Sequence, residues 1–183
     1  MNQPRNTPAR QRGVSLIEGL AALCVMSIVA GGALPSFEAQ FRLHQLKGTA
    51  ELLETDLQLA RSEAVTRNHP VRLTLNPGGL VAGSCYIVHT GPADACHCDA
   101  GQAPRCDAPA QVLRSVSITP EANVQVRSAV RSILFDGTLA TSTPTATLRV
   151  ESTGGASLHQ VVNVVGRIRT CTVAGTVPGY RNC

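Results

Sequence analysis

Two arginines near the C-terminal end could bind phosphate groups. Arg167 and Arg169 follow Gly166 and alternate with Ile168. On an extended chain both guanidinium groups project to one side, about 7 Å apart. Arginine offers a rigid fork of donors that suits phosphate oxygens, so this pair could contact successive phosphates of a nucleic acid. The alternative is a solvated strand end with two surface charges. Arg181 follows in the same acid-free stretch, from Gly166 to Cys183.

The cysteines indicate disulfide chemistry in an oxidising compartment. Six of the seven lie beyond the first quarter of the chain, at positions Cys85, Cys96, Cys98, Cys106, Cys171 and Cys183. An even number predicts three disulfides whose pairing cannot be deduced from spacing. We expect Cys171–Cys183, which would close the final loop, and leave the other pairings open. Zinc bound by Cys96, His97, Cys98 and Cys106 is the alternative, but a C-x-C lacks the usual paired spacing. We therefore predict no metal site.

No residue pattern indicates an enzyme. The five histidines (His44, His69, His89, His97 and His159) stand in unrelated contexts, without a nucleophile-plus-base motif or a phosphate-binding loop. We predict no catalytic residue and no cofactor.

The N-terminal region reads as a basic leader followed by an apolar span. Residues 1–13 are polar and contain three arginines, whereas residues 14–37 contain one charged residue, Glu18. The apolar run of roughly 20 residues suits a single membrane-spanning helix. Arginines before the run favour a cytoplasmic N-terminus. A carboxylate in such a run is costly and marks a function or a partner, unless Glu18 lies at the helix end and reaches the interface. Cys24 would be a small apolar residue of this span.

Charge elsewhere in the chain is balanced. Removing the three leader arginines from the sixteen basic residues leaves thirteen, against twelve acidic residues. Any surface that binds nucleic acid must therefore be local.

A second apolar pattern continues the helix beyond the span. Apolar residues recur at helical spacing, at Leu43, Leu46, Ala50, Leu53, Leu57, Ala60 and Ala64. Charged residues fill the remaining positions: Lys47, Glu51, Glu54, Asp56 and Arg61. We predict one helix from about Leu16 to Arg67, ended by Asn68-His69-Pro70 because the residue before a proline avoids the helical region. The stripe is predicted to pack under the rest of the protein.

The remainder of the chain predicts a β-rich head. Alternating segments separated by turn residues predict about seven strands, in residues 71–75, 84–89, 112–119, 124–127, 132–135, 146–150 and 159–165. These strands on the second half of the helix give an α+β fold. The expected organisation is a leader at 1–13, a long helix at 14–68, and a head at 69–183 closed by the C-terminal disulfide.

The N-terminal pattern resembles the cleavage signal of type IV prepilins. The resemblance rests on the basic leader, Gly13, the residues Val14-Ser15-Leu16-Ile17-Glu18, and Pro35. It implies cleavage after Gly13 by an inner-membrane prepilin peptidase and methylation of the new amine of Val14. It also implies that Glu18 attracts the N-terminal amine of a neighbouring subunit during assembly. The family usually has Phe at the first mature position, where this chain has Val14.

Three further segments resemble the GspH/FimT family of minor pilins and minor pseudopilins. They are residues 56–68 with 71–73, residues 133–137, and Gly166-Arg167-Ile168-Arg169. The resemblance implies a type IV pilin-like fold, with a helix on an antiparallel sheet. In the middle the chain departs from the family, because it has a cysteine-rich insertion and no Trp.

The resemblance also suggests two functions. A G-R-x-R motif is typical of FimT pilins implicated in DNA capture during natural transformation, and Gly166, Arg167 and Arg169 match it. This implies sequence-independent contact with double-stranded DNA, with Arg181 contributing. The alternative is a structural minor pilin, or a type II secretion pseudopilin, that primes filament assembly and binds no DNA. Both imply other pilins as partners, a single pass through the bacterial inner membrane with a periplasmic head, and assembly into a filament.

Overall fold

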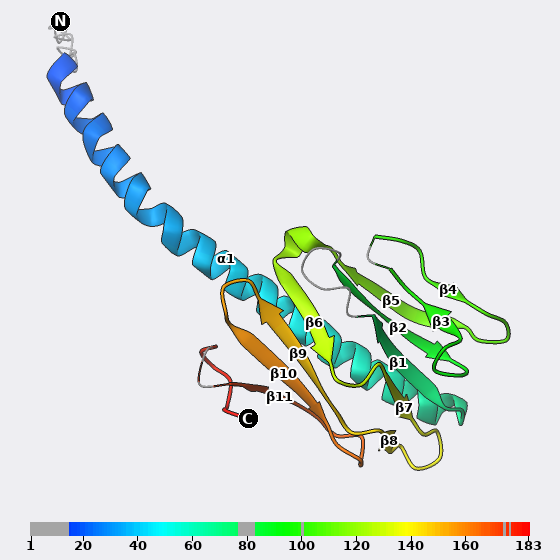
Figure 1. Ribbon diagram of the computed structural model, residues 1–183. Coiled ribbons are helices and arrows are strands. Elements are labelled where there is room, and N and C mark those ends of the chain that lie inside the picture. Colours follow the sequence, from blue (N-terminus) through cyan, green and yellow to red (C-terminus); the bar gives the residue numbers. More distant parts are fainter. Residues whose placement is uncertain (1–14, 77–82, 100, 174, 176) are drawn as a thin grey trace, which may run out of the picture. The chain divides into compact units, whose positions relative to one another are not determined.

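The computed structural model describes residues 15–76, 83–99, 101–173, 175 and 177–183, without the side chains of residues 30 and 32–36. The chain forms two compact units, residues 1–38 and 39–183. One helix, α1 (Leu16–Arg67), begins in the first unit and ends in the second (Figure 1). Its bounds confirm the predicted helix. At its end Asn68 adopts a left-handed conformation (φ 50°), and the N–H of His69 donates to the carbonyl of Ala64.

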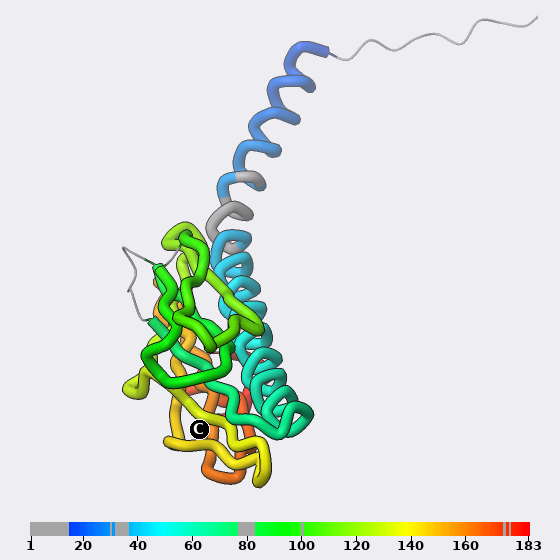
Figure 2. The backbone as a smooth tube through the Cα atoms, turned by 90° about the vertical axis from the view of Figure 1, so that its right-hand side faces the viewer, coloured from blue at the N-terminus to red at the C-terminus, as the bar shows by residue number. Residues whose placement is uncertain are grey.

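The predicted apolar stripe is buried, which confirms its role in packing. Leu46, Ala50, Leu53, Leu57, Ala60 and Ala64 are inaccessible to solvent, and Leu43 packs against them from the edge. This face of α1 contacts residues of both sheets in one core. Figure 2 shows the second half of the helix running alongside the strands of the head. Every residue of that core and all three disulfides lie within residues 43–183 of the described chain. The second unit therefore carries what it needs to fold by itself.

Asp56 corrects the prediction for the charged positions of the helix. Its side chain is only 3% exposed, because Tyr86 Oη donates to Asp56 Oδ2 over 2.8 Å and Arg114 Nε lies 3.5 Å from Oδ1. Burial and the bond to Asp56 raise the pKa of Tyr86 well above its usual value. Asp56 is therefore buried where the helix packs against the strands that carry Tyr86 and Arg114.

The head contains two antiparallel sheets and a short ribbon. The five-stranded sheet has the order β5-β2-β1-β7-β8, the four-stranded sheet β11-β10-β9-β6, and the ribbon pairs β3 with β4 (Figure 1). The strands of the first sheet are β1 (Val71–Asn76), β2 (Ser84–Thr90), β5 (Val112–Ile118), β7 (Ser132–Phe135) and β8 (Ser142–Thr143). The second contains β6 (Val124–Ser128), β9 (Ala146–Ser152), β10 (Ser157–Val162) and β11 (Ile168–Thr172), and the ribbon β3 (Cys96–His97) and β4 (Arg105–Cys106). A 3-10 turn, η1 (Pro120–Ala122), precedes β6. The helix with its antiparallel head is the predicted α+β, pilin-like fold.

The seven predicted strands are all present, with bounds that differ by at most three residues, and the structure adds four strands. Residues 159–165 were expected to form one strand, whereas β10 stops at Val162 because residues 163–166 make a turn. Strands β3, β4, β8 and β11 were not among the predicted strands.

The structure pairs all six cysteines of the head. The disulfides are Cys171–Cys183, the expected pair, together with Cys85–Cys98 and Cys96–Cys106. Cys85–Cys98 attaches the ribbon to β2, and Cys96–Cys106 joins the two strands of the ribbon, β3 and β4. The three cysteines considered as zinc ligands, Cys96, Cys98 and Cys106, are thus disulfide partners.

Several large apolar side chains that the structure describes in the first unit are exposed. Leu16, Ile17, Leu23, Met26 and Ile28 are each more than 60% exposed along α1, and Cys24 is a free, exposed thiol. Among the residues that the structure describes, no helix is both long and apolar enough to cross a membrane.

Candidate nucleic-acid interface

The C-terminal end of α1 meets two turns of the head through one arginine. Arg61 Nε donates to the carbonyl of Ala140, 3.1 Å away, in the turn between β7 and β8. Its Nη2 donates to the carbonyl of Val165, 3.4 Å away, in the turn between β10 and β11. A single guanidinium thus ties both turns to the helix. Arg61 was expected only as a charged position on the polar side.

Gly166 is required where this second turn approaches the helix. Its φ of 72° lies in the region that favours glycine. A Cβ at this position would overlap the carbonyl oxygen of Ala140 and lie 2.9 Å from Arg61 Nε. The glycine of the G-R-x-R motif therefore permits close packing and shapes the turn that precedes the arginines.

Gly137 serves the neighbouring turn in the same way. A Cβ there would lie 2.5 Å from the His69 nitrogen and 2.8 Å from the Ala64 carbonyl. Asp136 Oδ1 accepts the N–H groups of Thr138 and Leu139, both over 2.8 Å. The segments that carry the family resemblance thus meet at the end of α1, which explains their composition by packing.

The backbone around Arg167 is fixed by Asn163. The Asn163 carbonyl accepts the Gly166 N–H over 2.9 Å, and its side-chain Oδ1 accepts the Arg167 N–H over 2.9 Å. The Asn163 N–H donates to the Arg167 carbonyl over 3.1 Å. Sequence reasoning missed this asparagine, although asparagine and glycine are both residues that favour turns.

Arg167 and Arg169 are both exposed on either side of Ile168, which packs partly against the core. Arg169 lies in β11, the edge strand of the four-stranded sheet, and pairs with Val161 of β10. The next residue, Thr170, holds the strand to α1: its hydroxyl lies 2.5 Å from Glu54 Oε2 and 2.8 Å from Gln160 Oε1. Within the described residues, no ion pair involves Arg167 or Arg169.

Arg181 is not beside the other two arginines. Its carbonyl accepts the Thr172 N–H over 2.9 Å, so it lies next to the far end of β11. Thr172 lies five residue steps along the chain from Arg167, roughly 16 Å if the chain is extended. The Cys171–Cys183 disulfide and the parallel bridge between Thr172 and Asn182 fasten the tail there. Arg181 is exposed, at the opposite end of the strand from the motif.

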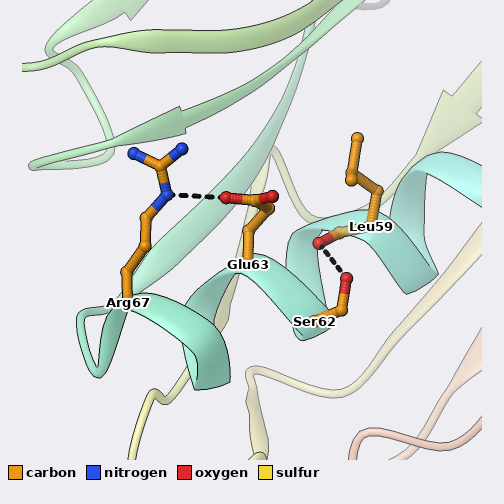
Figure 3. Close-up of polar contacts among 4 residues, drawn as sticks. All are labelled: Leu59, Ser62, Glu63 and Arg67. Atoms are coloured by element: carbon orange, nitrogen blue, oxygen red, sulfur yellow. Dashed lines mark hydrogen bonds and ion pairs between the residues drawn. The ribbon is translucent and has the colours of Figure 1, made fainter.

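Other basic residues near the helix end are already engaged. Arg67 Nε lies 2.6 Å from Glu63 Oε2, one helical turn earlier, and the Ser62 hydroxyl donates to the Leu59 carbonyl over 3.0 Å (Figure 3). Arg72 Nε donates to the Gly91 carbonyl. Arg167 and Arg169 differ from Arg67 and Arg72, because their side chains are exposed to solvent and make no ion pair among the described residues.

The histidines do not assemble into a catalytic group. His89 is buried, with Nε2 2.7 Å from the Thr74 hydroxyl and Nδ1 2.9 Å from the Thr90 carbonyl. Burial lowers the pKa of His89, the carbonyl of Thr90 opposes that shift, and Arg72 adds to it. Across the described parts of the chain, no group of three or more His, Cys, Asp or Glu residues could hold a metal ion.

The residues predicted for processing and assembly are Gly13, Val14 and Glu18. Gly13 and Val14 fall outside the described residues, and Glu18 is exposed in the first turn of α1.

Comparison with protein-family models identifies the family to which the chain belongs. The model of the family described as "Type II transport protein GspH" matches residues 49–166, more than half of the sequence. The chain belongs to the GspH family. The matched range includes the end of α1, both turns and Gly166, and stops just before Arg167. The packing that the two glycines permit therefore lies within the family match, while both arginines and the disulfide-closed tail lie beyond it.

Two crystal structures of the Pseudomonas aeruginosa type IV minor pilin FimU are similar to this GspH-family chain. One, in space group P65, has 19% sequence identity over 68% of this chain and 90% of FimU, with a TM-score of 0.49. The other, in space group P21, has 22% identity over 69% of this chain and 87% of FimU, with the same TM-score. Among curated proteins, no match to the chain was found.

Proposed function

We propose that this GspH-family protein is a minor type IV pilin that binds double-stranded DNA and so aids DNA uptake in natural transformation. The observation that carries the proposal is the presentation of Arg167 and Arg169. Both are exposed, they stand on either side of one half-buried residue, and a hydrogen-bonded turn fixes the backbone that holds them. A rigid mount lowers the entropy that two long side chains would lose on binding.

The chemistry fits the phosphate backbone better than the bases. Guanidinium forks bind phosphate oxygens whatever the sequence, and each neutralised phosphate contributes about 0.9 to the salt dependence of binding. Single-stranded binding uses aromatic side chains for stacking. Of the two tyrosines, Tyr86 is buried and Tyr180 lies beside Lys47 and Glu51 of α1, so neither flanks the motif. Duplex DNA is accordingly the proposed ligand.

The proposed path to the pilus follows from the N-terminal residues. A prepilin peptidase cleaves after Gly13, the amine of Val14 is methylated, and residues 14–37 hold the protein in the inner membrane with a periplasmic head. Glu18 then pairs with the amine of a neighbouring pilin as the subunit enters the filament. The exposed apolar side chains of α1 in the first unit support this, because they need a lipid or protein cover.

A structural role without DNA binding is the second candidate. It is favoured by the description of the matched family as a type II transport protein. In that case the protein primes assembly of a secretion pseudopilus or pilus, and the arginines are surface charges.

A gel shift with the soluble head, residues 39–183, tests the first candidate. We expect the head to retard duplex DNA at low salt, and Arg167→Gln/Arg169→Gln to lose most of this binding. The matched control is Arg105→Gln/Arg131→Gln, which removes two exposed arginines elsewhere in the head. DNA binding by these arginines is wrong if the wild-type head fails to retard duplex, or if the motif variant retards it as well as the control.

A further inference from the structure

The four-stranded sheet has one face in the core and one face turned away from it. On β10, Leu158, Gln160 and Val162 are buried, and Gln160 Nε2 donates to the Ala50 carbonyl of α1 over 2.9 Å. Because side chains alternate along a strand, His159 and Val161 lie on the opposite face. We call this opposite side of β6, β9, β10 and β11 the outer face.

The register of the strands places several basic residues on the outer face. Arg127 of β6 is the partner of Arg149 of β9, Arg149 is the partner of His159 of β10, and His159 is the partner of Cys171 of β11. In the adjacent row, Arg169 of β11 is the partner of Val161. Arg127, Arg149 and Arg169 are all exposed. Arginines therefore occur on three of the four strands, across roughly 14 Å at about 4.8 Å per strand.

The outer face is unevenly charged. The four strands contain one carboxylate, Glu151, which lies 3.8 Å from Arg127 and accepts a hydrogen bond from Gln125 Nε2 over 3.2 Å. Burial lowers the pKa of His159, the charge of Arg149 lowers it further, and Glu151 opposes both. The charge of Arg149 therefore affects the pKa of His159 more than the opposing charge of Glu151 does.

The pair of Arg127 and Arg149 is unfavourable for folding alone. Like charges directly opposite each other in an antiparallel pair destabilise a sheet. A single half-exposed carboxylate offsets this only in part. Because this exposed row of cations lowers the stability of the sheet, we expect it to serve in binding an anionic partner.

We propose that the DNA site continues from the motif across the outer face, so that the phosphate backbone of a duplex contacts Arg167, Arg169, Arg149 and Arg127. The inference rests on the proposed function and extends it. One head then neutralises about four phosphates, whereas the motif alone neutralises about two. Arg181 lies at the far end of β11 and does not belong to this path.

Salt dependence measures the number of phosphates directly. With a slope of about 0.9 per phosphate, four contacts give a slope of about 3.6 in log affinity against log salt, and two contacts about 1.8. Raising salt from 50 to 200 mM should weaken wild-type binding about 150-fold, but a two-contact variant only about 12-fold.

The experiment follows binding of a fluorescent 20-base-pair duplex by anisotropy over that salt range. We expect Arg127→Gln/Arg149→Gln to lower both affinity and slope, and Arg105→Gln/Arg131→Gln to keep the wild-type values. Arg149→Lys retains the charge and should keep a slope close to wild type. Circular dichroism and a thiol count establish that each variant is folded with its disulfides formed.

The outcomes separate the two proposals. If Arg167→Gln/Arg169→Gln loses binding while Arg127→Gln/Arg149→Gln keeps the wild-type slope, the outer-face path is wrong and the motif site stands. If the wild-type head does not bind the duplex, both proposals fail. If only the outer-face variant loses binding, the motif site is wrong, and with it the continuous path.

Discussion

Arg114 on the five-stranded sheet and Arg169 on the four-stranded sheet differ in what surrounds the same side chain. Arg114 lies 3.5 Å from the buried Asp56, which also accepts the Tyr86 hydroxyl. Arg169 is exposed in an edge strand, beside a turn that packing and Asn163 hold in place. Arg114 is about half exposed and pairs with a buried carboxylate, whereas Arg169 is exposed without an ion pair among the described residues. If the proposed function is right, the five-stranded sheet contributes this contact to stability and the four-stranded sheet contributes arginines to binding.

The largest expected effect is a loss of stability on breaking the Asp56 contact of the five-stranded sheet. Asp56→Ala leaves the Tyr86 hydroxyl buried without its acceptor and Arg114 without its partner, so we expect it to lower the free energy of unfolding by about 3 kcal/mol. Urea denaturation of the head measures this. DNA affinity of the folded variant at low temperature should be unchanged, and a parallel loss of affinity would contradict the separation of roles.

The next effect concerns the turn that presents the motif. Gly166→Ala forces a Cβ into the Ala140 carbonyl in addition to straining a positive φ, and should cost about 2 kcal/mol. Gly155→Ala is the matched control, because its φ is 82° but nothing lies within 4 Å of its Cβ. The control should cost about half as much. Gly166→Ala should also weaken DNA binding, since the turn positions Arg167; equal effects of the two changes on stability would show that the close approach is unimportant.

A smaller effect is expected from the buried histidine of the five-stranded sheet. Because burial lowers the pKa of His89, the unfolded chain binds its proton more readily than the folded head does. Its contribution to stability is therefore present above about pH 6.5 and is lost as the pH falls through that value toward the folded pKa. Chemical denaturation between pH 7.5 and 5 should show a steeper loss for wild type than for His89→Gln. His97→Gln, at an exposed position of β3, is the control, and a wild-type slope in His89→Gln would contradict the assignment.

The smallest expected effect is a gain in the stability of the head, not a loss. Arg149→Gln removes one of two like charges that face each other across β6 and β9, so we expect the head to gain about 0.3 kcal/mol in stability. Arg114→Gln should instead destabilise it. A thermal melt at low ionic strength, repeated at high salt, distinguishes them because screening abolishes the gain. A loss of stability in Arg149→Gln would mean that this arginine has a structural role.

The sequence predicted the features that depend on local pattern. The bounds of α1 followed from the apolar stripe and from Pro70, and the strands of the first sheet followed from alternation between turn residues. Strand β11 was missed because a short edge strand with one arginine, two threonines and a cysteine has little apolar alternation. The closing disulfide was expected because Cys171 and Cys183 bound one short loop.

Features that depend on distant partners were beyond the sequence. Asp56 meets Tyr86 and Arg114, which lie 30 and 58 residues further along, so its burial needed the sheet. The pairing of Cys85 with Cys98 required the position of the β3–β4 ribbon against β2. The row that joins Arg127, Arg149 and His159 exists only through strand register, which no spacing along the chain reveals.

The parallel bridge between Thr172 and Asn182 covers part of the β11 edge against self-association. An edge strand offers unpaired amides and carbonyls to which another chain can add, and natural proteins cover such edges. Here the N–H of Thr172 donates to Arg181 and its carbonyl accepts the N–H of Cys183, so the last residues of the chain fill these positions. The disulfide to Cys171 keeps that cover in place. Reduction of this one bond should therefore favour edge-to-edge aggregation of heads before it unfolds them.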